Sequence, residues 1–283
     1  MKSTTNNFTM LAQNSDSNYV EQACLAAMSI YANVDNPSIC LITNDPVPDK
    51  YKMLFDHIVE IPWGDHAADE DWKISNRWKI YHAIPYEETI VMDTDMLVLS
   101  DITSWFDFLK NYDLFYTSNV YTYRGELVTN NYYRRGFEKF NLPNLYCGLH
   151  YFKKCDLAHE FYTWLEMITN NWQQFYKAHA GGKIYQNWCS MDLSSAIAAK
   201  IMNIETIITN PKTKKPSFVH MKPRIQNWQE NFSNRWQDRV AAYIDDDCNL
   251  TIGNYSQTGV FHYTEKDFVT KDMLKKFEKK IGI

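Results

Sequence analysis

Short apolar runs alternate with amphipathic stretches along this chain, and the pattern predicts an α/β fold. The apolar runs predict strands at 8–11, 38–42, 57–61, 90–92, 96–99, 113–117, 145–154, 217–220 and 260–263. Apolar residues at helical spacing predict helices that start near residue 18 and at 71–82, 104–109, 156–172, 191–202 and the C-terminal end. Because strands and helices alternate through the first half, we expect a mixed, mostly parallel central sheet flanked by helices, of Rossmann-like type.

The most apolar part of the chain, residues 89–102 (TIVMDTDMLVLSDI), is interrupted by Asp93 and Asp95. Its flanking runs suit a strand buried on both faces. Buried charge is unfavourable unless it is paired or bound to a metal, so we expect both carboxylates where the strand emerges. Ligands of open α/β sheets bind at that edge, and two hard oxygen donors there suit Mg²⁺ or Mn²⁺. A polar turn between strands is the alternative reading, but the stretch has none of the Gly, Pro or Asn residues typical of turns.

Length and composition favour one folded domain. The 283 residues are 45% hydrophobic, and we find no repeat and no linker. We expect a single domain, with roughly residues 8–209 as the core and 210–283 as a C-terminal elaboration that closes the site. The net charge of −5 argues against broad binding to nucleic acid or anionic membranes. Scattered cysteines, no secretion signal and no apolar run of membrane-spanning length predict a cytoplasmic protein without a transmembrane segment.

Two further segments carry candidate chemistry. Residues 121–135 are polar and aromatic, with several Tyr and Arg residues. This segment is read either as an ordinary surface loop or as an acceptor-side wall or lid, because aromatic rings and Arg suit the faces of sugars and bases. Gly148 lies in the strand predicted at 145–154, where it permits close backbone approach to a ligand.

Four motifs occur in an order that resembles a known family. They are Asp16-Ser17-Asn18-Tyr19 after the first strand, Arg77-Trp78-Lys79, Asp93-Thr94-Asp95 with a trailing Asp101, and Asp192 at a helix start. Together they resemble the nucleotide-sugar glycosyltransferases of the GT-A fold, and most closely the family of glycogenin and the bacterial lipopolysaccharide galactosyltransferases. The resemblance covers roughly residues 8–222.

The resemblance implies a role for each matching residue. Asp192 and Arg77 are the implied catalytic residues. The nucleotide-sugar site is expected to comprise Asn14, Asp16, Asn18, Arg77, Lys79, Asp93, Thr94, Asp95, Gly148, Lys222 and Lys266. The metal, Mn²⁺ or Mg²⁺, is expected on Asp93, Asp95 and a C-terminal histidine. Two histidines fit the family pattern, namely His220 with Lys222 and His262 with Lys266, and both remain candidates.

The implied function is metal-dependent transfer of a sugar from a nucleotide donor, expected to be UDP-linked, to an acceptor hydroxyl with retention. A glycan is the expected acceptor, and a hydroxylated nucleobase in DNA or a protein hydroxyl are alternatives. Tyr146 and Leu193 stand where the family has Asn and Gln on the donor-sugar side. These departures leave open a non-catalytic sugar-nucleotide-binding protein. A nucleotidyltransferase ranks last, because residues 14–18 lack the glycines of a phosphate loop.

Overall fold

The computed structural model describes residues 6–68, 70, 73–181, 188–226 and 235–283. Within these residues a central six-stranded sheet has the strand order β3-β2-β1-β4-β8-β6. Its strands are β1 (Asn6–Leu11), β2 (Pro37–Ile42), β3 (His57–Val59), β4 (Glu88–Met92), β6 (Leu114–Thr117) and β8 (Tyr146–Lys153). Strand β8 runs antiparallel to both of its neighbours, whereas β1 to β4 pair in parallel. The predicted mixed, mostly parallel sheet is confirmed.

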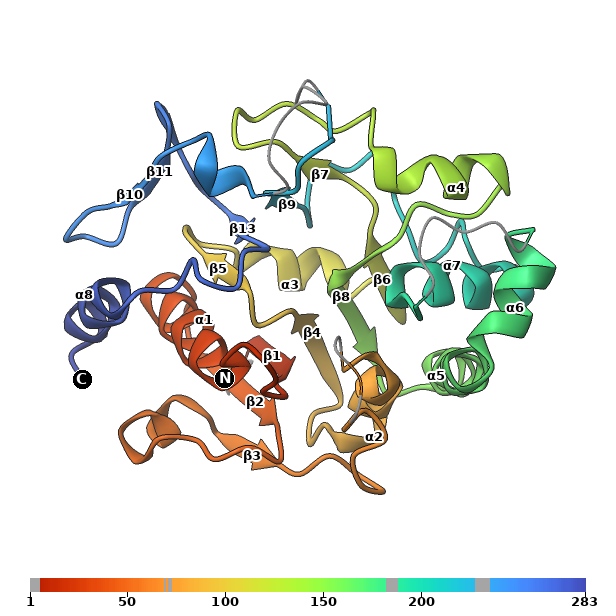
Figure 1. Ribbon diagram of the computed structural model, residues 1–283. Coiled ribbons are helices and arrows are strands. Elements are labelled where there is room, and N and C mark those ends of the chain that lie inside the picture. Colours follow the sequence, from red (N-terminus) through yellow and green to blue (C-terminus); the bar gives the residue numbers. More distant parts are fainter. Residues whose placement is uncertain (1–5, 69, 71–72, 182–187, 227–234) are drawn as a thin grey trace.

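Helices cover both faces of this sheet (Figure 1). One face packs against α1 (Tyr19–Asn33) and α3 (Ser104–Leu109), and α8 (Lys271–Ile281) packs against the outer side of α1 (Figure 1). The other packs against α2 (Ile80–Ala83), α4 (Arg135–Lys139), α5 (Asp156–Asn170), α6 (Trp172–His179) and α7 (Met191–Met202). A hydrophobic core lies on each face of the sheet: the first core on the α1 side and the second core on the α5 side. Strand β4 contributes to both, with Ile90 and Met92 in the first core and Val91 in the second core. This alternation explains why its sequence is continuously apolar.

In a second sheet, strands from the C-terminal part of the chain pair with the strand that follows β4. Its order is β5-β13-β9-β7, with β5 (Met96–Val98), β7 (Val120–Tyr121), β9 (Phe218–His220) and β13 (Val260–His262). The chain leaves the central sheet at the end of β4 and enters the second sheet at β5, so residues 93–95 form the link between the two sheets. Strands β10 (Ala242–Ile244), β11 (Leu250–Ile252) and β12 (Tyr255–Ser256) form a separate antiparallel sheet.

Two of the predicted helices begin after a side-chain cap. Asn18 accepts a hydrogen bond from the backbone N–H of Glu21 at 3.0 Å, and α1 begins at the next residue. Helix α7 occupies the predicted range, and Ser190 accepts from the backbone of Leu193 at its start. No helix of the described residues is long and apolar enough to cross a membrane.

The helix predicted at 71–82 is wrong in type over most of its described length. Residues 71 and 72 lie outside the described residues, and Ile74–Lys79 forms a 3₁₀ helix, η2, before the short α2. Lys73 ahead of it is left-handed (φ 51°), which prevents an α-helix from starting there. Ile84, which precedes Pro85, is extended and ends the segment. The remaining 3₁₀ turns are η1 (Asp49–Leu54), η3 (Tyr132–Arg134) and η4 (Trp236–Asp238).

Candidate functional site

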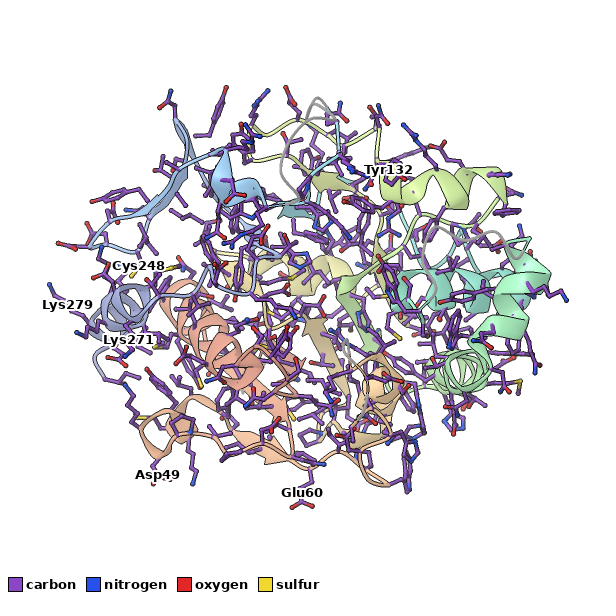
Figure 2. The ribbon with its side chains drawn as sticks, in the orientation of Figure 1. Asp49, Glu60, Tyr132, Cys248, Lys271 and Lys279 are labelled. Atoms are coloured by element: carbon purple, nitrogen blue, oxygen red, sulfur yellow. The ribbon has the colours of Figure 1, made fainter. Side chains whose placement is uncertain are left out.

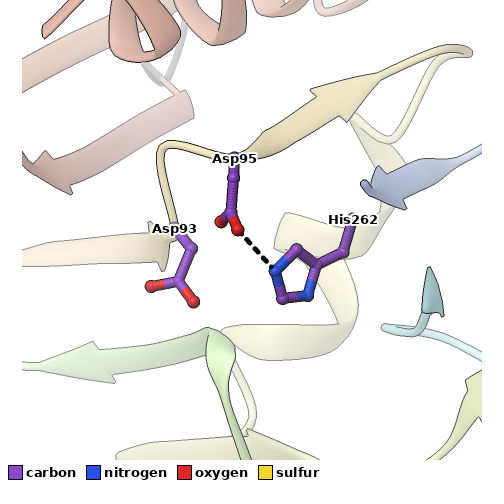
Figure 3. Close-up of side chains that lie close together, drawn as sticks. All are labelled: Asp93, Asp95 and His262. Atoms are coloured by element: carbon purple, nitrogen blue, oxygen red, sulfur yellow. Dashed lines mark hydrogen bonds and ion pairs between the residues drawn. The ribbon is translucent and has the colours of Figure 1, made fainter. Parts of the chain in front are cut away.

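The link between the two sheets holds Asp93 and Asp95 opposite His262 (Figure 3). The backbone N–H of Asp93 donates to the carbonyl of Gly148 at 2.9 Å, which continues the pairing of β4 with β8. His262 ends β13, the antiparallel partner of β5, and its Nε2 lies 3.0 Å from Asp95 Oδ2. One ligand atom from each of the three residues lies within 4.8 Å of the others. Two carboxylates and one imidazole suit Mn²⁺, and this donor set fits the metal implied by the motifs.

Asp95 and His262 form an ion pair. Burial alone raises the pKa of the Asp95 carboxyl, but His262 and then Arg77 outweigh burial and hold that pKa below its usual value. Burial likewise opposes charge on His262, and Asp95 outweighs it, so the pKa of the imidazole is raised. The carboxylate therefore stays ionised and ready to bind a cation.

His220 lies behind His262 and outside this group of three. The two residues are register partners in β9 and β13, and their Nδ1 atoms are 3.2 Å apart. Burial, followed by the neighbouring His262, holds the pKa of His220 well below its usual value, so His220 is neutral. Nδ1 of His262 carries a proton when the imidazole is protonated beside Asp95, and also when its Nε2 binds a metal. In either state the Nδ1–H of His262 donates and His220 Nδ1 accepts. Of the two candidate histidines, the structure brings His262 to the aspartates, while His220 orients it.

This arrangement predicts a role for His220 in metal affinity. His220→Leu removes the acceptor for the Nδ1–H of His262, so the imidazole loses its fixed orientation and tautomer. We expect Mn²⁺ affinity to fall by roughly 10–100-fold, the usual effect of removing such a partner. Titration of free Mn²⁺ followed by electron paramagnetic resonance measures it. His220→Asn, which keeps an oxygen acceptor, should recover part of the affinity, and wild-type affinity in His220→Leu would contradict the assignment.

Arg77 and Gly148 hold the Asp93 carboxylate in place. The guanidinium of Arg77 makes an ion pair with Asp93 Oδ1. A Cβ atom at position 148 would lie 3.0 Å from Asp93 Oδ2 and 2.7 Å from Met96 Cε. A side chain at position 148 would therefore displace the Asp93 carboxylate, which packs directly on this backbone. The neighbour that packs on Gly148 in the structure is Asp93, and the predicted approach of this backbone to a ligand stays a prediction.

A cleft of about 200 Å³ opens above the two aspartates. Of the residues predicted for the nucleotide-sugar site, its lining includes Arg77, Asp93, Thr94, Asp95 and Lys266. Sequence reasoning did not assign the other lining residues, namely Leu11, Gln13, Tyr19, Gln22, Lys73, Ile74, Thr264 and Glu265. Tyr19 could have been predicted from the sequence, because it is the last residue of the Asp16–Tyr19 motif. Burial, together with nearby Asp95, raises the pKa of the Tyr19 phenol to about 12, so the cleft presents a neutral hydroxyl.

The loop before α1 is fixed to the C-terminal part of the chain. Lys266 Nζ lies 2.6 and 2.8 Å from the two carboxylate oxygens of Asp16. Asn14 accepts from the backbone of Val20 at 3.0 Å, and Asn18 caps the same helix. Asn14 and Asn18 thus shape the loop, while the Asp16–Lys266 pair closes it against the segment after β13.

Lys79 does not reach the cleft. Its side chain is fully buried, and its ammonium donates to the carbonyl of Gly64 at 2.5 Å. The adjacent Trp78 ring packs in the second core. The structure therefore does not bring Lys79 together with the other residues predicted for the nucleotide-sugar site.

Asp192 is held on both carboxylate oxygens at the start of α7. Oδ1 accepts from the backbone N–H of Cys147 at 2.8 Å, and Oδ2 pairs with the guanidinium of Arg134. Arg134 is itself buried, donates to the carbonyl of Leu145 at 2.7 Å and lies 3.9 Å from the ring centroid of Tyr146. This ion pair joins residues 58 positions apart, so no local pattern in the sequence could reveal it.

Lys222 stands near Asp192 as well. Its ammonium lies 4.1 Å from the ring centroid of Tyr133. Burial lowers the pKa of Lys222, while Asp192 and Asp95 act in the opposite direction. The two candidate lysines therefore occupy different places: Lys266 pairs with Asp16 at the loop before α1, and Lys222 lies toward Asp192.

No protein-family model and no curated protein sequence matches this chain. Solved structures do resemble it. The galactosyltransferase LgtC, in complex with donor and acceptor sugar analogues, has a TM-score of 0.52 at 13% identity, covering 98% of this chain and 95% of LgtC. Mouse xyloside xylosyltransferase 1 has a TM-score of 0.49 at 11% identity, covering 94% of this chain and 100% of that one. The glycosyltransferase GlyE of Streptococcus pneumoniae TIGR4 has a TM-score of 0.43 at 13% identity, covering 73% of this chain. This chain spans only 45% of GlyE.

The likeness to LgtC shows the fold. The alignment runs over nearly the whole length of both chains, and the chain has the GT-A type of fold that the four motifs predicted.

Proposed function

We propose that this protein is a metal-dependent glycosyltransferase that moves a sugar from a UDP-linked donor to an acceptor hydroxyl with retention. The observation that carries the proposal is the group of Asp93, Asp95 and His262 on a GT-A fold, in which both aspartates line the cleft. LgtC, with the same fold, was solved with donor and acceptor sugar analogues. The proposed acceptor is a glycan.

In the proposed mechanism the cleft binds the nucleotide and neutralises the diphosphate as it leaves. Asp93, Asp95 and His262 would hold Mn²⁺, which when bound would supply positive charge that favours departure of a diphosphate. Arg77 keeps Asp93 in position and adds fixed positive charge beside it. The loop closed by Asp16 and Lys266 borders the nucleotide end. Much of the rate would come from positioning and from this preorganised charge.

Asp192 is proposed to act on the sugar. Both of its oxygens are already engaged, by Arg134 and by the backbone of Cys147. A carboxylate held in this way is positioned to stabilise positive charge that develops on the sugar ring. Leu193, one of the two departures from the family pattern, is buried in the second core.

Calorimetric titration of UDP with and without Mn²⁺ tests the donor half of the proposal. We expect binding that requires the metal, and slow Mn²⁺-dependent hydrolysis when UDP-glucose or UDP-galactose replaces UDP. A protein that binds UDP but hydrolyses no UDP-sugar would be a non-catalytic binding protein. Absence of UDP binding under both conditions would refute the proposed donor.

A further inference from the structure

The segment at 121–135 joins residues 221–226 to form one wall next to Asp192. The backbone N–H of Tyr132 donates to the carbonyl of Arg224 at 3.1 Å, and that of Gln226 donates to Asn130 at 2.6 Å. An isolated antiparallel bridge joins Asn131 to Ile225. A wall at 121–135 was one of the two interpretations of the sequence. Its pairing with residues 221–226 was not indicated by any local pattern.

This wall is built with strained backbone. Arg224 and Gln226 are both left-handed, with φ of 61° and 52°. Such a conformation is unfavourable by roughly 1–2 kcal/mol for a residue with a Cβ atom. Backbone strain of this kind gathers at ligand-binding sites, where the surrounding structure maintains it. Here the hydrogen bond from the backbone N–H of Tyr132 to the carbonyl of Arg224 helps to hold this backbone in place.

Three cations of the wall lie against tyrosine rings instead of acids. The guanidinium groups of Arg135 and Arg224 lie 5.1 and 5.2 Å from the ring centroid of Tyr132. Lys222 lies against Tyr133. No acidic residue in the described part of the chain forms an ion pair with any of the three. A cation stacked on a ring keeps its N–H donors for a ligand, and this local excess of positive charge occurs in a chain of net charge −5.

The wall is connected to the proposed site on the side of Asp192. Arg134, between Tyr133 and Arg135 in the chain, forms the ion pair with Asp192. Arg77 and Lys266, the latter paired with Asp16, line the cleft elsewhere. The donor phosphates thus have their own cations, and Arg135 and Arg224 are left for a different anionic group.

We propose that the acceptor is a glycan that carries a phosphate near the accepting hydroxyl, and that Arg135 and Arg224 bind this phosphate. The inference rests on the proposed function. Guanidinium groups are suited to phosphate because their N–H pairs match two of its oxygens. A nucleic acid is less favoured, because the Tyr132 ring is already engaged by two guanidinium groups and three cations fall short of the roughly 6–10 phosphate contacts of a typical DNA-binding surface.

The test compares matched sugars on the protein loaded with UDP and Mn²⁺. Glucose and glucose 6-phosphate, and mannose and mannose 6-phosphate, are titrated by calorimetry. We expect the phosphorylated member of a pair to bind at least roughly tenfold more tightly, a charge-assisted effect. The double variant Arg135→Gln/Arg224→Gln should lose this preference and keep wild-type affinity for UDP. The control is Lys279→Gln/Lys280→Gln on α8, far from Tyr132 in the molecule (Figure 2).

Each outcome decides one question. Normal UDP binding with no preference for the phosphorylated sugars, or with an equal preference in the double variant, overturns the inference and leaves the proposed function intact. If the wild-type protein shows no Mn²⁺-dependent binding of UDP, the proposed function is refuted instead. If a 20-nucleotide single-stranded DNA binds in an Arg135- and Arg224-dependent manner and the sugar phosphates do not, the acceptor is a nucleic acid and the inference is wrong.

Discussion

Asp95→Asn is expected to abolish Mn²⁺-dependent binding of UDP while the fold survives. Asp95 supplies one of the three ligand atoms and also holds His262 through its ion pair. The substitution removes the negative charge from both interactions. Loss of a partner outside the ligands typically lowers metal affinity by about 10–100-fold, so loss of a ligand should exceed 100-fold. Calorimetry of Mn²⁺ alone, and then of UDP with Mn²⁺, measures the effect.

Asp101→Asn is the matched control. Asp101 lies six residues further along the same stretch, is exposed, and accepts from the backbone N–H of Thr103 at 2.7 Å. Asparagine can make the same hydrogen bond, so Mn²⁺ and UDP affinity should stay at wild-type values. Normal sugar transfer by Asp95→Asn would mean that the carboxylate pair is only a polar connection between two sheets, and the proposed metal dependence would be wrong.

The fold was predictable because its signals are local. Each signal spans only a few consecutive residues: an apolar run for β1, β2, β4 and β8, and Asn18 at the start of α1. Each predicted the element that forms. The same local signals failed at η2, where the positive φ of Lys73 overrides an apparently helical pattern. A left-handed non-glycine residue leaves little trace in a sequence, because almost any residue can be held there by its surroundings.

The site was predictable only as far as single motifs define it. Asp93, Asp95 and Arg77 were found, and the structure brings them together in one cleft. The choice between His220 and His262 depends on how β13 pairs with β5 and β9, strands far apart in the sequence. The same holds for Arg134 and Asp192, whose ion pair forms only when residues 121–135 fold against α7. Lys79 matched its motif, yet its ammonium faces the protein interior.

Asp192→Asn is expected to lower turnover by roughly 10²–10³-fold and to leave UDP affinity nearly unchanged, since loss of one preorganised electrostatic group typically has this effect on rate. The asparagine oxygen can still accept from Cys147, but its NH₂ group would then face the guanidinium of Arg134, which places two donors against each other. Leaving the buried Arg134 without its partner should also reduce the free energy of unfolding by about 1–3 kcal/mol. Steady-state kinetics with a UDP-sugar, UDP calorimetry and thermal unfolding measure the three effects separately.

The control for this substitution is Asp156→Asn, the same chemical change in the first turn of α5, where the side chain is exposed. It should alter neither turnover nor UDP affinity. The relation between turnover and affinity in Asp192→Asn distinguishes two roles for the carboxylate. A fall in turnover alone places Asp192 in the chemical step, because only an interaction that strengthens in the transition state changes rate without changing donor binding. An equal fall in both would mean that Asp192 and Arg134 shape the sugar side of the cleft, and the charge that stabilises the reacting sugar would then have to come from another group.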